Sequence, residues 1–308
     1  MSLPSARKLH LFTGLKYQVL EWGADDSTLD HTVVLVHGFL DSSFSFEALA
    51  HAGLDRKYHL VAPDLRGHGD SDRVGAGGYY HFMDYVADLS CVIDQLGRRR
   101  VSLVGHSMGG TVAAYFAGVF PDRIYKLALL EGLGPPDNDW KDWPPRIAAW
   151  ISAWKRRKPS NSAARGGNKR YATLQQAAER LSATDEKLTL KEALRLAEVS
   201  TLRLADGQYV FKHDPLHLTP SPYLFMVAGA ESLWRRIKCP TLIVNGADSE
   251  FRLAHEELNR RVACFAAASQ VVLPGAGHMM QRHKPRELAQ LLDEFLSDDR
   301  TEDLHKRQ

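Results

Sequence analysis

The chain has 308 residues, of which 44% are hydrophobic and 25% are charged, and its formal net charge is +2. This length is enough for one large domain, or for a domain with an insertion, that buries a sizeable core. The small net charge gives no reason to expect a nucleic-acid surface. No apolar run reaches the 18 residues that a membrane span requires, so we expect no membrane insertion.

Three cysteines, Cys91, Cys239 and Cys264, lie far apart in the sequence. An odd number without a Cys-x-x-Cys pair argues against a disulfide framework and against a zinc site. Residues 1–15 lack the apolar stretch of a signal peptide. We therefore expect a cytoplasmic protein without a metal site.

The first part of the chain predicts strands that alternate with turns and helices. The expected strands cover residues 15–22, 32–36, 58–62, 101–104 and 126–130. A helical period covers 85–96. The run Thr32–Val36 is rich in β-branched residues, which is typical of a strand covered on both faces. This alternation predicts right-handed crossovers and a doubly wound, mostly parallel sheet.

The same alternation resumes near the end, with expected strands at 241–244 and 270–273 and helices at 254–262 and 285–296. The segment between has a different composition and predicts mainly helices. We therefore divide the chain into a core, 1–134 and 238–308, and an inserted cap, 135–237.

Local signals inside the insertion predict its elements. Pro144 and Pro145 can open a first helix, and Thr189 with Glu192 predicts a capping box. Asp206-Gly207 predicts a hairpin turn, and a last helix is expected from residue 221. A basic stretch at 155–170 is interpreted as a solvated loop, with binding of a phosphate-bearing substrate such as an acyl-coenzyme A as the alternative.

Three loops follow expected strands: residues 37–41, 63–71 and 105–110. Open parallel sheets place their active sites at the carboxyl ends of the strands, so these loops should converge on one crevice. The third loop, Gly105-His106-Ser107-Met108-Gly109, predicts a nucleophile elbow, because a serine hydroxyl needs an exposed position on a tight strand-to-helix turn. A helix-capping serine is the structural alternative.

Taken together, residues 32–43, 63–71, 105–110 and 274–279 resemble the α/β-hydrolase superfamily. Two shorter stretches, 131–136 and 212–215, resemble its serine hydrolase-like branch. The resemblance implies an eight-stranded, mostly parallel sheet with helices on both faces and an inserted, mainly helical cap. It also implies that Asp64, Arg66 and Ser71 fix the conformation of their loop.

The resemblance assigns Ser107 as the nucleophile and His278 as the general base. Among 14 histidines, His278 alone follows the last strand in a glycine loop, downstream of the serine and of an acid. The third member should orient the imidazole. We prefer Asp248, although the family spacing is usually one residue longer; Glu131 is the alternative acid, and Glu250 is a further one.

The oxyanion hole should consist of backbone amides, with Met108 N–H after the nucleophile and Phe39 N–H implied by the resemblance. Trp140, Trp143 and Trp150 are candidate substrate-binding residues, although such a stripe is more often a face that packs on the core.

The sequence thus predicts a cofactor-free serine hydrolase that cleaves a carboxylic ester, or a thioester, of a small to medium, largely apolar small molecule. One alternative is a carbon–carbon bond hydrolase of ring-cleavage products. A second is a catalytically silent ligand receptor on the same fold. The oligomeric state does not follow from the sequence.

Overall fold

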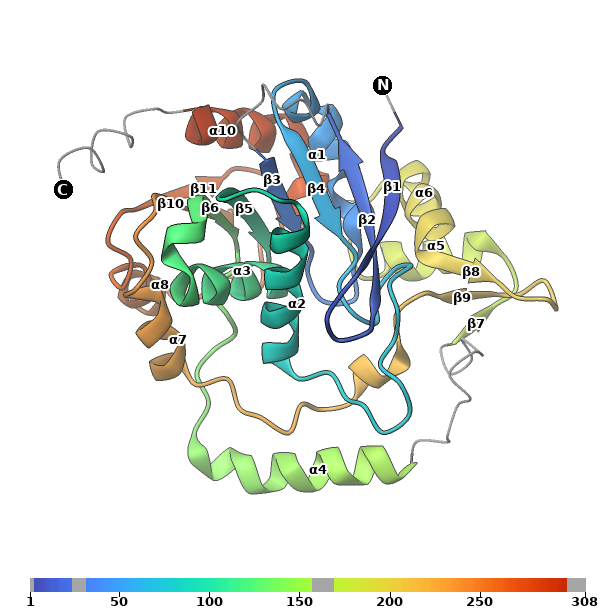
Figure 1. Ribbon diagram of the computed structural model, residues 1–308. Coiled ribbons are helices and arrows are strands. Elements are labelled where there is room, and N and C mark those ends of the chain that lie inside the picture. The colour runs from blue at the N-terminus through green and yellow to red at the C-terminus, as the bar shows by residue number, and fades with distance from the viewer. Residues whose placement is uncertain (1–2, 24–31, 157–168, 298–308) are drawn as a thin grey trace.

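The computed structural model describes residues 3–23, 32–156 and 169–297. Within them, eight strands form one sheet in the order β1-β2-β4-β3-β5-β6-β10-β11 (Figure 1). The strands are β1 (Ser5–His10), β2 (Lys16–Trp22), β3 (Thr32–Val36), β4 (His59–Pro63), β5 (Val101–His106), β6 (Ile124–Leu130), β10 (Thr241–Gly246) and β11 (Ala268–Leu273). β2 is antiparallel to both β1 and β4, and the other neighbours pair in parallel. This is the mostly parallel, eight-stranded sheet that the family resemblance implies.

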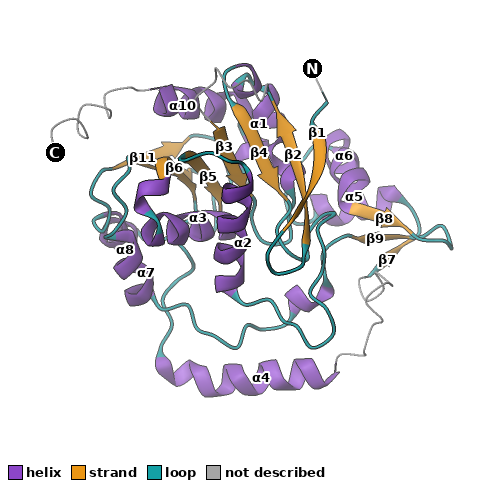
Figure 2. Ribbon diagram, in the orientation of Figure 1, coloured by secondary structure: helices purple, strands orange, loops and turns teal. Residues whose placement is uncertain are grey.

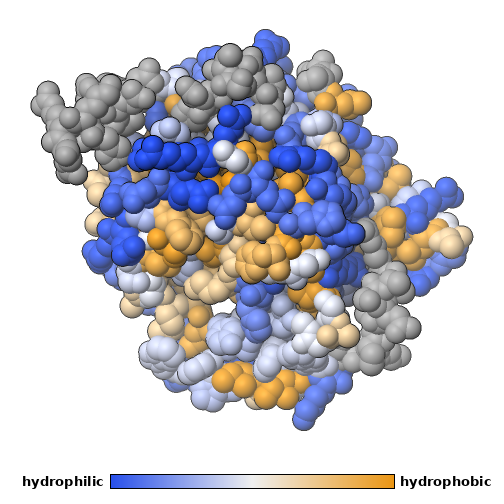
Figure 3. Space-filling model, viewed as in Figure 1, coloured by the Kyte–Doolittle hydropathy of each residue, from blue (hydrophilic) through white to orange (hydrophobic). Residues whose placement is uncertain are grey.

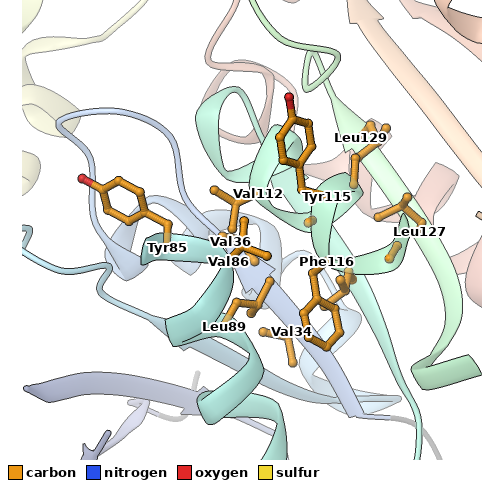
Figure 4. Close-up of a cluster of buried hydrophobic side chains, with 14 of the residues drawn as sticks. Val34, Val36, Tyr85, Val86, Leu89, Val112, Tyr115, Phe116, Leu127 and Leu129 are labelled. Atoms are coloured by element: carbon orange, nitrogen blue, oxygen red, sulfur yellow. The ribbon is translucent and has the colours of Figure 1, made fainter. Parts of the chain in front are cut away.

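Helices cover both faces of this sheet (Figure 2). One face packs against α2 (Phe82–Gln95), α3 (Met108–Val119), α7 (Val227–Trp234) and α8 (His255–Val262). The other packs against α1 (Glu47–His51), α9 (Met280–His283) and α10 (Pro285–Ser297). Because side chains alternate along a strand, Val34 and Val36 of β3 belong to the first core and Val33 and Leu35 to the second. Figure 4 shows part of the first core, where α2 and α3 meet β3 and β6.

The sequence pattern does not predict β1. Five of its six side chains are exposed, and Leu9 alone is buried, so the strand lacks the apolar alternation on which such a prediction rests. An edge strand held by backbone pairing to β2 needs no apolar face.

The insertion between β6 and β10 is mainly helical, as predicted. It contains α4 (Trp143–Arg156), α5 (Leu174–Ser182), α6 (Leu190–Ser200), α7 and a small sheet of β7 (Arg170–Tyr171), β8 (Thr201–Arg203) and β9 (Tyr209–Phe211). The capping box at Thr189 is present. So is the hairpin, with Gly207 at φ 83° in its turn. Most of the predicted basic stretch, residues 157–168, lies outside the described residues.

The last helix of the insertion starts at Val227, not at residue 221 as expected. Two carbonyl groups in 221–226 accept hydrogen bonds from other segments. Trp143 Nε1 donates to Pro222 O over 2.9 Å, and Asn138 Nδ2 donates to Phe225 O over 2.9 Å. The short helix α7 belongs to the same buried hydrophobic cluster as α3. The part of the chain that packs on the main sheet therefore starts before residue 238, the boundary expected from the sequence.

The loop after β4 is held by a buried ion pair. Arg66 donates from Nε and Nη2 to the two carboxylate oxygens of Asp88, over 2.6 and 2.8 Å. The Asp88 side chain is fully buried, and that of Arg66 is 7% exposed. Asp64 accepts from Ser43 and from Asp70 N–H, and Ser71 Oγ donates to Asp64 O. These contacts fit the loop-fixing role expected of Asp64, Arg66 and Ser71.

Replacing Asp88 with asparagine is expected to lower the free energy of unfolding by about 3 kcal/mol, because it removes the only fully buried carboxylate that pairs with Arg66 among the described residues and leaves the part-exposed Asp84. Asp84 provides a matched control, since it contacts the same guanidinium over 2.8 Å but is 36% exposed. Asp84→Asn should cost less than about 1 kcal/mol. Urea unfolding followed by circular dichroism measures both. Equal losses would contradict this account of the loop.

No helix in the part of the chain that the structure describes is long and apolar enough to cross a membrane.

Candidate active site

Ser107 lies on a strained turn between β5 and α3. Its backbone has φ 51° and ψ −121°, a conformation that non-glycine residues rarely adopt. The glycine two residues later permits close packing: a Cβ on Gly109 would collide with the carbonyl oxygens of Val36 and His37. The helix therefore starts directly beside the end of β3. This geometry is that of a nucleophile elbow.

The side chain of Ser107 is not used to cap α3. Ser107 is the residue before the helix, yet its side chain makes no capping hydrogen bond. The structural alternative of a helix-capping serine is therefore wrong. The residue is partly exposed, and the N-terminus of α3 places a positive dipole end beside it.

His278 lies next to the elbow and pairs with Glu131. Its Nδ1 is 2.6 Å from Glu131 Oε2, and its backbone carbonyl accepts a hydrogen bond from His106 Nε2 over 2.8 Å. Burial and the neighbouring His278 lower the pKa of His106 to about 3, so that this ring stays neutral. Since His106 precedes Ser107 in the chain, its bond to the His278 loop brings the candidate base to the serine turn.

Glu131 is a buried carboxylate with three hydrogen-bond donors. Its side chain is 3% exposed and accepts from Gly246 N–H over 2.9 Å, from Ser249 Oγ over 2.7 Å and from His278. Burial raises the pKa of Glu131, but the bonds from His278, Ser249 and Gly246 outweigh burial and lower the pKa below its ordinary value. The ionised carboxylate requires the Nδ1–H tautomer of His278, which leaves Nε2 free to act as a base.

The preference for Asp248 as the orienting acid is wrong in this structure. Asp248 N–H donates to Ala276 O over 2.9 Å, and its carboxylate pairs at the surface with Lys187 of the insertion over 2.8 Å. The side chain is 47% exposed, and the bond from Lys187 lowers its pKa. The next residue, Ser249, faces Glu131 instead. Glu250 is exposed and has no contact with His278 among the described residues.

Glu131 reaches His278 because β6 ends close to α3. A Cβ on Gly132 would lie 2.6 Å from Gly110 Cα, so two glycines allow this approach. Glu131 itself has φ 48°, and its N–H donates to Val244 O over 2.9 Å. The backbone therefore continues the pairing with β10 while the side chain turns toward the histidine.

The loop after β3 lies against Ser107. A Cβ on Gly38 would be 2.9 Å from His106 Nδ1 and 3.2 Å from Ser107 Cβ, so a larger residue would push these side chains away. His37 fixes the loop: its Nε2 accepts from Leu65 N–H over 2.9 Å, and its Nδ1–H donates to Gly38 O over 2.7 Å. Phe39 follows at once, and the residue is 49% exposed. Phe39 thus follows a residue that closely approaches Ser107, and the assignment of Phe39 N–H and Met108 N–H as oxyanion donors stays a prediction.

The tryptophans differ in their surroundings. Apolar residues gather over α4 at the lower edge of Figure 3. Trp140, which precedes α4, is 61% exposed, and Trp143, its first residue, is 37% exposed. Trp150 faces inward and packs edge-to-face on Tyr79, with ring centroids 5.7 Å apart. No described contact places any of the three beside Ser107 or His278, so their predicted role in substrate binding lacks support here.

Sequence reasoning missed two residues of the site. Ser249 donates to Glu131, and Phe251, which is 71% exposed, lies with its ring centroid 4.5 Å from that of His278. Both follow Asp248 within three positions. One signal was available in the sequence: Asp248 follows its strand one residue earlier than the usual family spacing, which indicates that the loop after β10 differs from the family pattern.

No group of three His, Cys, Asp or Glu side chains within 3–23, 32–156 and 169–297 could hold a metal ion. The three cysteines are unpaired thiols.

Comparisons with known proteins agree with this fold. The α/β hydrolase fold family matches residues 31–285. Serine hydrolase-like protein of Danio rerio is 32% identical over 182 residues, which cover 59% of this chain and 54% of that protein. The chain thus matches about half the length of this relative.

Two further matches cover nearly the whole chain. A putative 2-succinyl-6-hydroxy-2,4-cyclohexadiene-1-carboxylate synthase of Bacillus subtilis (strain 168) is 27% identical over 289 residues, 92% of this chain and 96% of that protein. The crystal structure of the hypothetical protein PA1622 of Pseudomonas aeruginosa PAO1 superposes with a TM-score of 0.82 at 25% identity, covering 96% of this chain and 100% of that one.

The chain therefore belongs to the α/β-hydrolase superfamily. Over about half of that relative's length it is similar to serine hydrolase-like protein, the branch that its short motifs resemble.

Proposed function

We propose that the protein is a serine hydrolase that cleaves a carboxylic ester through an acyl-enzyme on Ser107. One observation carries the proposal: His278 pairs through Nδ1 with the buried Glu131, and its backbone carbonyl accepts a hydrogen bond from His106. His106 directly precedes Ser107, whose backbone is strained and whose side chain makes no capping hydrogen bond. A nucleophile, a base and an orienting carboxylate in this arrangement support acyl transfer.

In the proposed reaction, Ser107 Oγ attacks the ester carbon while His278 Nε2 takes its proton. Glu131 stabilises the imidazolium that forms. Phe39 N–H and Met108 N–H donate to the developing oxyanion, aided by the dipole of α3. His278 then protonates the leaving alcohol, which leaves an acyl-enzyme. Water, deprotonated by His278, hydrolyses that ester and restores Ser107.

We propose a small to medium, largely apolar substrate, because the exposed rings of Phe39 and Phe251 lie at the oxyanion loop and on His278. The insertion would act as the cap of this site. A thioester fits the same groups. The unpaired thiols of the cysteines support a reducing compartment such as the cytoplasm.

The competing reaction class is carbon–carbon bond cleavage; the Bacillus subtilis relative, for its part, is named as a putative synthase of a cyclohexadiene carboxylate. A panel of p-nitrophenyl esters graded by acyl length, assayed beside a vinylogous diketone, separates the classes. We expect turnover of short and medium esters and none of the diketone. Turnover of the diketone alone would assign carbon–carbon bond cleavage, and turnover of neither would favour the silent receptor.

A further inference from the structure

The turn between α5 and α6 of the insertion contacts the loop that carries His278. Asp185 Oδ1 accepts a hydrogen bond from His283 Nε2 over 2.8 Å, with the two side chains 11% and 6% exposed. Two residues later, Lys187 Nζ donates to Asp248 Oδ2 over 2.8 Å and to Gly275 O over 3.3 Å. The first contact is buried and the second is about half exposed.

The hydrogen bonds of His283 fix its tautomer. Gly277 N–H donates to His283 Nδ1 over 3.1 Å. A backbone N–H can only donate, so Nδ1 carries no proton and the proton lies on Nε2, facing Asp185. Burial raises the pKa of Asp185, but the bond from His283 outweighs burial and lowers it. An ionised Asp185 therefore selects the one tautomer that can hold Gly277.

Gly277 immediately precedes His278, so the backbone is held on both sides of the candidate base. His106 donates to His278 O on one side, and His283 accepts from Gly277 N–H on the other. A Cβ on Gly277 would lie 3.2 Å from His283 Cε1, so the ring packs directly on the loop. His106 belongs to the core, whereas the tautomer of His283 depends on a residue of the insertion.

We propose that Asp185 is a positioning residue for His278: through the tautomer of His283 it fixes the loop that keeps His278 against Glu131. Without Asp185, the Nδ1–H tautomer of His283 becomes accessible, and that proton faces the Gly277 N–H. The loop then shifts, and the pairing of His278 with Glu131 weakens. Docking of the insertion on the core is thereby coupled to the base. The catalytic consequence rests on the proposed function, but the structural coupling does not.

The test compares Asp185→Ala and Asp185→Asn with wild type. Lys187→Ala is the matched control, because it removes the half-exposed contacts of the same turn, to Asp248 and Gly275 O, and leaves Asp185 and His283 in place. Side-chain ¹⁵N NMR reports the tautomers of His283 and His278. We expect a pure Nε2–H His283 and a bonded Nδ1–H His278 in wild type and in Lys187→Ala. Asp185→Ala should show mixed tautomers of His283 and a His278 Nδ1–H that exchanges with water.

The rate of Ser107 labelling by a fluorophosphonate gives the catalytic readout without a known substrate. Misplacing the base should slow labelling and lower kcat by about tenfold in Asp185→Ala, with KM within about twofold of wild type. Asp185→Asn keeps an acceptor oxygen but loses the negative charge. This variant replaces the alanine variant in the test if the alanine variant does not fold. It should lose about threefold.

Unchanged His283 and His278 signals in a folded Asp185 variant would overturn the proposal, whatever its activity. An equal loss in Lys187→Ala would also overturn it, since docking in general would then be the cause. A wild type that neither labels nor hydrolyses esters would refute the proposed function, while the NMR comparison would still decide the coupling.

Discussion

Replacing Ser107 with alanine is expected to abolish fluorophosphonate labelling and to lower kcat for p-nitrophenyl esters by about 10⁵- to 10⁶-fold. The substitution removes only the hydroxyl group, and this group makes no helix-capping hydrogen bond. Folding should therefore be unaffected, so the loss is purely chemical. Mass spectrometry of the labelled protein and steady-state kinetics measure the two effects.

A thermal melting curve of Ser107→Ala provides the control for folding. Labelling of the alanine variant at another serine would remove Ser107 from the proposed chemistry. An unlabelled wild type would favour a ligand receptor over an enzyme. His278→Ala should label about 10³-fold more slowly than wild type, because the serine then lacks its base.

Replacing Glu131 with glutamine should lower kcat by about 10³- to 10⁴-fold, because the amide can donate to Nδ1 and so favours the tautomer that carries its proton on Nε2. In that tautomer His278 cannot accept the proton of Ser107. The matched change, Asp248→Asn, should leave kcat within about twofold of wild type, because Asp248 lies at the surface on Lys187.

Ester hydrolysis by both variants, measured at equal protein concentration, separates the two carboxylates. Ser249→Ala adds a graded test, since it removes one of the three donors to Glu131 and should cost less than Glu131→Gln. A large loss in Asp248→Asn with near-normal Glu131→Gln would contradict the assignment of Glu131 as the orienting carboxylate.

Much of the fold could be predicted because the core strands are continuous apolar runs. All five residues of β3 are buried, as the run of β-branched residues predicts. The prediction failed where structure depends on distant backbone contacts. β1 is held by its pairing with β2, and the start of α7 follows from carbonyls that bond to Trp143 and Asn138.

The sequence by itself determined the nucleophile elbow and the loop histidine, since each depends on a short motif whose strand, glycines and helix are neighbours in the chain. It led to a wrong preference for Asp248 over Glu131, because both follow strands that end at the same edge of the sheet and no local pattern separates them. The tertiary structure decided. Close packing at Gly132 turns Glu131 toward His278, and Lys187 of the insertion holds Asp248 at the surface. Which carboxylate meets the base thus depends on contacts between segments far apart in sequence, and no local pattern records them.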